Sequence, residues 1–242
     1  MNREKLLVGA CTMILLLTPF SPGFAGWGDL LKTVQEAVEG SSGPSRGEIV
    51  DGLKQALEIG TGNTVRALSR LDGYYGHPEV NIPLPQSVQT VEKLLRTTGF
   101  GPQLDAFELS MNRAAEKAAP EAEALFVDAI KAMTFADAQQ ILKGADDAAT
   151  VYFRDKTADQ LQALFKPIVH ASMDRVGVTR TYRSLSEKME TLPFAADYAV
   201  DLDDYVTGKS IDGLFIRLAQ EEARIRNDPA ARVTELLQKV FR

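Results

Sequence analysis

Apolar residues recur through most of this chain at the spacing of an α-helix. The clearest stripe occupies positions i, i+3, i+4, i+7, i+8 and i+11, and consists of Ala122, Leu125, Phe126, Ala129, Ile130 and Met133. Side chains at this spacing share one helix face, and an apolar face must be buried against other elements. The sequence therefore predicts an all-α fold, a compact domain of about ten helices.

Further stripes and end signals support this fold class. A second stripe comprises Leu104, Phe107, Met111, Ala114, Ala115 and Ala118, and a third comprises Ile211, Leu214, Phe215, Leu218 and Ile225. Thr134 with Asp137, and Thr157 with Gln160, are typical of capped helix starts. Gly144 is typical of a helix end.

The stretch from Asp72 to Gln86 is the exception, because it holds two glycines and three prolines and must be partly extended. Long irregular loops are often functional, so its Tyr74, Tyr75 and His77 are candidate binding residues. Alternatively, the stretch is a strap whose apolar residues cover the core. Residues 80–82 could also pair with residues 198–202 as a minimal β-ribbon.

Residues 1–25 have the three parts of a cleavable signal peptide: two basic side chains, an apolar run from Leu6 to Leu17, and small residues before Gly26. A membrane-spanning helix needs about 20 apolar residues, so the run is too short to remain an anchor. Most of the run follows Cys11, which argues against a lipid anchor on that cysteine. We therefore expect a periplasmic protein with no stable membrane span after cleavage.

Cleavage would leave residues 26–45 as a short helix and linker, and residues 46–242 as a single helical domain. The leader holds two of the 27 basic and one of the 33 acidic residues, so the mature net charge is −7. Interspersed acidic charge is poorly suited to nucleic acid, which needs clustered Lys and Arg. Cys11 is the only cysteine, so the mature chain has no thiol chemistry.

Motifs for catalysis, metals and cofactors are not found in the sequence. The chain has two histidines, His77 and His170, and no Gly-x-Ser-x-Gly. A zinc site needs three or four His, Cys or carboxylate ligands, and no such set is evident. The acidic run from Asp201 to Asp204 lacks the glycine and glutamate of a calcium loop and instead favours a helix start. We expect neither a metal site nor a cofactor.

Two polar sets remain as candidates for binding or for a buried polar network. Glu108, Asn112 and Glu116 share one helix face with Arg113 beside them, opposite the Leu104–Ala118 stripe. This face is either an ordinary solvated surface or, if another layer covers it, a buried network. Glu222 falls within the third apolar stripe, where a carboxylate is costly unless it is paired. Arg226, one turn later, is its expected partner.

Several consecutive blocks resemble the bacterial domain-of-unknown-function family 4197. They are Ile82–Pro85, Phe107–Ala118, Asp128–Lys131, Phe165–Val169, Tyr205–Thr207, Asp212–Phe215 and Asp228–Arg232. The similarity runs from about residue 49 to residue 241. The resemblance implies an exported helical protein of a Gram-negative-type bacterium, without an activity or catalytic residues to carry over.

Three hypotheses for function follow from these observations. The leading one is a non-enzymatic binding or interaction module for a protein, a peptide or an apolar small molecule, because catalytic machinery is missing and a long aromatic loop is present. The alternatives are a carboxylate-dependent hydrolase or lyase built on Glu108, Glu116 or Glu222, and a purely structural envelope protein. A hydrolase or lyase would need two of these acids to face one cavity.

Overall fold

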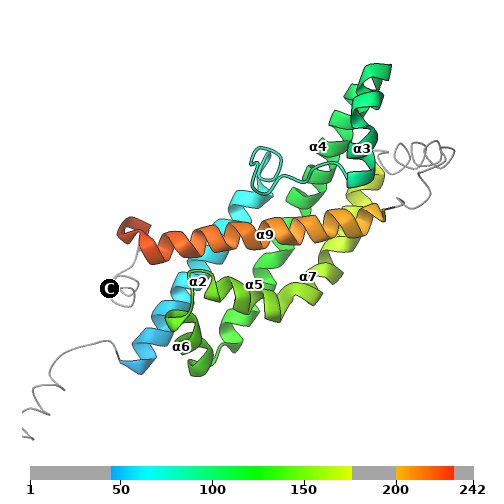
Figure 1. Cartoon of the computed structure of the whole chain (residues 1–242). Helices are drawn as coiled ribbons and strands as arrows, with labels where there is room; N and C mark the ends of the chain where they lie inside the picture. Colours follow the sequence, from blue (N-terminus) through cyan, green and yellow to red (C-terminus); the bar gives the residue numbers. More distant parts are fainter. Residues whose placement is uncertain (1–44, 176–199, 232–242) are drawn as a thin grey trace, which may run out of the picture. The chain divides into compact units, whose positions relative to one another are not determined.

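The computed structural model describes residues 45–175 and 200–231, and these are helical apart from the connections between helices (Figure 1). The α-helices are α2 (Arg46–Ser69), α3 (Gln86–Leu95), α4 (Gly101–Ala118), α5 (Ala122–Ala132), α6 (Phe135–Lys143), α7 (Ala148–Arg175) and α9 (Leu202–Asn227). Shorter helical turns are η1 (Arg96–Phe100), η2 (Ala119–Glu121) and η3 (Pro229–Ala231). The described residues contain no strand, so the all-α prediction is confirmed.

The expected number of about ten helices is too high for the described residues, which form seven α-helices. One reason is Thr157, which was predicted to start a helix but lies inside α7. Its hydroxyl donates to the Phe153 carbonyl one turn earlier (2.7 Å). A hydroxyl can therefore bond within a helix as readily as at its start, and the sequence pattern alone does not separate the two.

The other end signals are confirmed. Thr134 and Asp137 form a reciprocal capping box at the start of α6, and Gly144 is its C-cap residue. Asp201 caps α9 by accepting a hydrogen bond from the Asp204 backbone N–H (3.1 Å). The acidic run therefore begins a helix, where negative charge complements the helix dipole.

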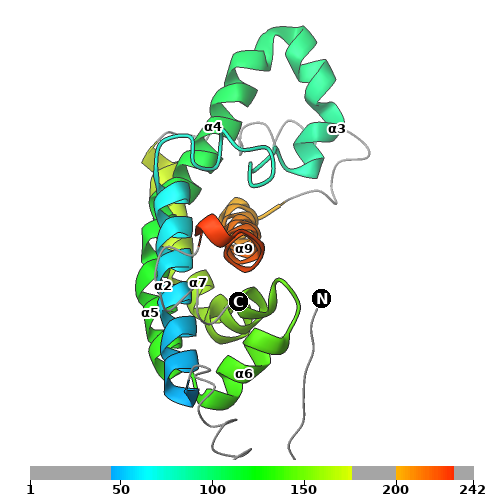
Figure 2. The ribbon, with the colours of Figure 1, turned by 90° about the vertical axis from the view of Figure 1, so that its left-hand side faces the viewer.

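Helix α9 lies against a layer that includes α2, α4 and α7, as Figures 1 and 2 show from two directions. It runs antiparallel to α7, because Glu222 contacts Ala149 at one end and Asp203 contacts His170 at the other. Helices α5, α7 and α9 meet at the ring of Phe126 on α5. Its centroid is 5.1 Å from that of Phe153 on α7 and 6.3 Å from that of Phe215 on α9. All three predicted apolar stripes supply the core.

Residues 70–85, hereafter the strap, connect α2 to α3 without regular secondary structure. Tyr74, Val80, Ile82 and Leu84 are buried in the main core cluster. The strap interpretation of this proline-rich stretch is therefore correct. The predicted β-ribbon is wrong for the described residues: Ile82 is not in a strand, and Leu202 begins α9. Residues 198 and 199 of the expected partner lie outside the described part.

Helices α3 and α4 form a hairpin through η1, where Gly99 has a φ of 90°. This left-handed conformation favours glycine, and it reverses the chain direction between the two helices. In Figure 2 the hairpin rises beyond the strap, away from α9. Its far end therefore stands apart from the helical layers.

The chain divides into two units, Met1–Gly43 and Pro44–Arg242. The expected signal peptide (1–25) and nearly all of the short helix and linker (26–45) fall on residues that lie outside the described part. Among the described helices, none is both long and apolar enough to span a bilayer.

Candidate functional site

The strap covers the polar face that was predicted on α4. The side-chain amide of Asn112 bonds both backbone polar atoms of Ile82: the Ile82 N–H donates to Oδ1, and Nδ2 donates to the Ile82 carbonyl, each at 2.9 Å. Asn112 Nδ2 also donates to the Glu108 carbonyl at 2.9 Å. Asn112 thus replaces the neighbouring strand that an extended backbone would otherwise need.

Glu116 holds the first half of the strap in the same way. Its Oε1 accepts hydrogen bonds from the backbone N–H groups of Tyr74 (3.2 Å) and Tyr75 (3.4 Å). Its Oε2 accepts from Arg113 Nη1 at 2.6 Å, and Arg113 Nη2 donates to Asp72 Oδ1 at 2.6 Å. The buried carboxylate therefore has donors at both oxygens, as a buried charge requires.

Tyr74 is a core residue. Its hydroxyl donates to the Ser210 carbonyl at 2.7 Å, and its ring packs against Gly213 of α9. Burial, with a smaller contribution from the negative charge of Glu116, raises the pKa of the Tyr74 phenol. Tyr74 therefore stays neutral and joins the strap to α9.

The remaining strap candidates lie at the surface. Tyr75 is exposed, and His77 is half-buried at the surface, 3.3 Å from Arg70 and 3.9 Å from Glu79. Glu108 is half-buried on α4, where desolvation is the main cause of its raised pKa. The structure thus brings together Asn112, Arg113, Glu116 and Tyr74, and leaves Tyr75, His77 and Glu108 at the edge.

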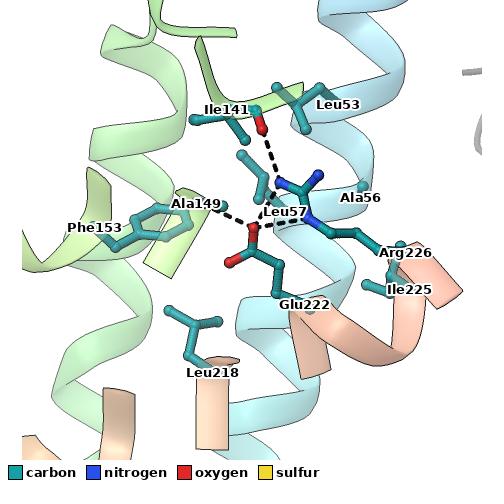
Figure 3. Close-up of a pocket in the computed structure, with 11 residues that line it drawn as sticks. Leu53, Ala56, Leu57, Ile141, Ala149, Phe153, Leu218, Glu222, Ile225 and Arg226 are labelled. Atoms are coloured by element: carbon teal, nitrogen blue, oxygen red, sulfur yellow. Dashed lines mark hydrogen bonds and ion pairs between the residues drawn. The ribbon is translucent and has the colours of Figure 1, made fainter. Parts of the chain in front are cut away.

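Glu222 and Arg226 form the predicted pair, and Figure 3 shows them at the N-terminus of α7. Glu222 Oε1 accepts from Arg226 Nη2 (2.8 Å) and from the Ala149 N–H (2.9 Å). Its Oε2 accepts from the Thr150 N–H (2.8 Å) and hydroxyl (2.9 Å). Helix N-termini have unpaired N–H groups and favour negative charge, so Glu222 acts as a cap supplied by α9.

Arg226 extends this pair to a third helix, because its Nη2 also donates to the Ile141 carbonyl of α6 at 2.8 Å. The carbonyl of Ile141 lies in the last turn of α6, where a cation is favourable. One ion pair of α9 thus joins the end of α6 to the start of α7. Its position explains why a carboxylate interrupts the apolar stripe.

A small apolar pocket lies beside the pair, lined by Leu53, Ala56, Leu57, Gly60, Ile141, Ala149, Phe153, Leu218, Glu222, Ile225 and Arg226 (Figure 3). Its volume is about 20 Å³. This volume is enough for roughly one water molecule, whereas drug-sized ligands occupy pockets of about 300–1,000 Å³. In this conformation the pocket cannot hold an organic ligand.

Two of the buried carboxylates, Glu116 and Glu222, are placed to hold backbone rather than to react. Glu222 lines the small pocket and Glu116 does not. Each carboxylate already accepts hydrogen bonds at both oxygens. Paired acid–base catalysis needs two groups that face one substrate site, so this geometry gives no support to that chemistry. Within residues 45–175 and 200–231, no group of three His, Cys, Asp or Glu residues could hold a metal ion.

The sequence interpretation missed the end of the α3–α4 hairpin, where two large apolar side chains face water. Leu94 is 61% exposed and Phe100 is 42% exposed. A signal was present, since Leu94 and Leu95 are adjacent in the last turn of a strongly amphipathic helix, and only one of them can face α4.

A family model described as a protein of unknown function (DUF4197) matches residues 43–242. No curated protein and no solved structure matched the chain. The match covers most of the sequence, including the strap, the hairpin, Glu116 and Glu222. The chain therefore belongs to the DUF4197 family.

Proposed function

We propose that this protein is a non-enzymatic interaction module of the bacterial periplasm that binds another macromolecule through its α3–α4 hairpin. The observation that supports it most directly is the exposure of Leu94 (61%) and Phe100 (42%) at the end of that hairpin. Exposed apolar side chains grouped on a projecting element are typical of interaction sites. Export by residues 1–25 is part of the proposal and rests on the leader sequence.

The hairpin is a ready-formed contact element. Val88 of α3 and Phe107 of α4 are buried in the main core cluster, so the hairpin is anchored in the core. Gly99 fixes the reversal at its far end. A rigid element loses little conformational entropy on binding, so a small number of apolar contacts can give useful affinity.

The polar interior supports this proposal over the carboxylate enzyme. Glu116 and Glu222 hold backbone N–H groups of the strap and of α7, so both carboxylates have a sufficient structural role. An enzyme built on them predicts that Glu116→Gln and Glu222→Gln lose an activity while the fold keeps its stability. Our proposal predicts that both substitutions lower the free energy of unfolding.

In-cell photocrosslinking tests the proposal. A photoreactive phenylalanine analogue would replace Phe100 in the full-length chain, and Phe135 of α6, which is 36% exposed, would be the matched control. We expect a discrete adduct of higher mass in the periplasmic fraction from position 100 and none from position 135. If neither position gives an adduct, or both give the same one, the hairpin is not a specific contact surface and the proposal fails.

A further inference from the structure

Charged side chains link the two helices of the hairpin close to the reversal at Gly99. Arg96 Nη1 lies 2.8 Å from Asp105 Oδ1 of α4, and Arg96 Nε lies 2.7 Å from Glu92 Oε1 of α3. One turn farther from the reversal, Glu92 on α3 and Glu108 on α4 occupy the same faces as Arg96 and Asp105. The hairpin therefore carries an attractive pair near its far end and two like charges one turn nearer the strap.

Glu108 carries the unbalanced charge of this set. Asn112 donates to the backbone carbonyl of Glu108 and not to its carboxylate. Within residues 45–175 and 200–231, that carboxylate has neither a hydrogen bond nor an ion pair. The guanidinium of Arg96 is already bonded to Glu92 and Asp105. A half-buried carboxylate without a bonded partner is costly in its ionised form.

Apolar burial acts in the opposite direction to this charge. Val91 and Leu95 lie one turn apart on one face of α3 and are only half-buried, whereas Val88 at the start of the helix is buried. Figure 2 shows α3 and α4 as two arms of an arch that join at the far end. Bringing the arms together would remove more apolar surface from water, while the like charges of Glu92 and Glu108 oppose it. The spacing of the arms therefore depends on whether Glu108 is ionised.

The surroundings of Glu108 favour its neutral form. Burial raises the pKa of Glu108 above its ordinary value of 4.5. The charge of Glu92 raises this pKa further, Arg96 counteracts the rise, and Asp105 adds to it. The titratable group of α9 that is affected by the charge of Glu108 is Tyr205, whose own pKa is raised mainly by burial, so it stays neutral. Because folding favours protonated Glu108, its stabilising contribution is full below pH 4.5 and disappears as the pH rises through the native pKa.

We propose that the α3–α4 hairpin is a pH-sensitive element, which closes when Glu108 takes up a proton and opens when Glu108 is ionised. The inference rests on the proposed function for its regulatory meaning, because the hairpin is also the proposed contact element. Closure changes how the two arms lie relative to each other, so the surface offered to a partner changes with pH.

Spin labels on the two arms test the movement directly. Cys11 of the leader is the only cysteine, so the mature protein can be labelled at introduced cysteines alone. Lys93→Cys and Ala106→Cys place nitroxides at exposed positions of α3 and α4. Double electron–electron resonance from about pH 7 to about pH 4 should show a shift to shorter label–label distances as Glu108 is protonated. Labels at Asp51→Cys and Glu123→Cys, exposed on α2 and α5, are the matched control and should keep their distance.

Carboxyl substitutions assign the movement to Glu108. An NMR titration of the Glu108 carboxyl should give a midpoint above 4.5. Glu92→Gln removes the like charge and should lower this midpoint, whereas Glu58→Gln, at an exposed position of α2, should leave it unchanged. Glu108→Gln imitates the protonated carboxyl, so its labelled arms should show the short distance already at neutral pH and no further change on acidification.

Three results would overturn the inference. They are a Glu108 midpoint at or below 4.5, a wild-type label distance that does not change with pH, and a pH-dependent distance that persists in Glu108→Gln. These measurements use the purified protein without a partner. The crosslink at position 100 does not depend on them, so the proposed function and this inference can fail separately.

Discussion

The side chain of Asn112 forms a two-way hydrogen-bonded pair with the backbone of Ile82, thirty residues earlier in the chain. This pair closes the polar face of α4 beneath the strap. Because both groups are buried, neither can exchange its partner for water. The pair therefore determines where the strap lies.

Replacement of Asn112 by Leu should destabilise the protein by about 2 to 4 kcal/mol, because two buried backbone groups of Ile82 lose their partner. Urea denaturation measures the change, and the Ile82 amide should lose its protection against hydrogen exchange. Asn81→Ala is the control, since it removes an exposed side-chain hydrogen bond from Asn81 Nδ2 to the Tyr75 carbonyl. An Asn112→Leu protein as stable as the control would contradict the role of this pair.

Gly213→Ala should destabilise the fold by about 1 to 3 kcal/mol through overpacking. An added Cβ would lie 2.7 Å from Tyr74 Cε1 and 3.3 Å from Val80 Cβ. Gly208→Ala on the same helix is the control, because nothing lies within 4 Å of its added Cβ. That variant should gain about 0.5 to 1 kcal/mol from higher helix propensity. Thermal unfolding should show a lower Tm for Gly213→Ala and a higher Tm for Gly208→Ala than for wild type. Changes of Tm in the same direction would refute the close packing of Tyr74 against Gly213.

Glu222→Ala should cost about 3 kcal/mol, since it leaves the Arg226 guanidinium and the N-terminus of α7 without their shared acceptor. Glu222→Gln keeps one acceptor and loses the charge, so its loss should be smaller. Chemical denaturation gives both values. Glu58→Ala, at an exposed position of α2, should stay within about 0.5 kcal/mol of wild type. If the free energy of unfolding of Glu222→Ala equals that of Glu58→Ala, Glu222 does not cap α7.

His170 should make stability depend on pH near neutrality. Its Nδ1 lies 2.7 Å from Asp203 Oδ2, and its Nε2 lies 3.2 Å from Asp174 Oδ2. The hydrogen bond to Asp203, followed by the charges of Asp203 and Asp174, raises the pKa of His170 above its ordinary value of 6.5. The protonated form is therefore stabilised by folding. Its contribution is full below pH 6.5 and disappears as the pH rises through the native pKa.

An NMR titration of the His170 ring should give a midpoint above 6.5. The free energy of unfolding should fall less for His170→Gln than for wild type as the pH rises through that midpoint. His77→Gln serves as the control and should leave the titration of His170 unchanged. A wild-type midpoint at or below 6.5 would show that the link between α7 and the first turn of α9 does not favour the charged imidazole.

The apolar half of the fold was predictable from the sequence. The stripes of α4, α5 and α9 could be read directly, because helical geometry places residues three and four apart on one face whatever the surroundings are. Local caps such as Thr134 with Asp137 were predictable for the same reason, since both partners lie within one turn. Thr157 was misread because its hydroxyl bond inside α7 uses the same local spacing.

The fate of the polar residues was decided by tertiary structure. The sequence of the face with Glu108, Asn112 and Glu116 is the same whether these side chains hydrogen-bond to water or to the strap. The hydrogen bonds that hold the strap there join α4 to residues about 30 to 40 positions earlier in the chain. Glu222 accepts hydrogen bonds from the first backbone N–H groups of α7, more than seventy positions earlier in the chain. Long-range partners of this kind carry no local periodicity.

The sequence by itself determined that this chain is helical, which faces of its helices are apolar, and that a proline-rich segment must be extended. Tertiary structure alone decided that Asn112, Glu116 and Glu222 bind backbone, and that Leu94 and Phe100 remain exposed. The physical reason is that periodicity reports on which side of a helix a residue lies. Burial and pairing depend on what the rest of the chain brings to that side.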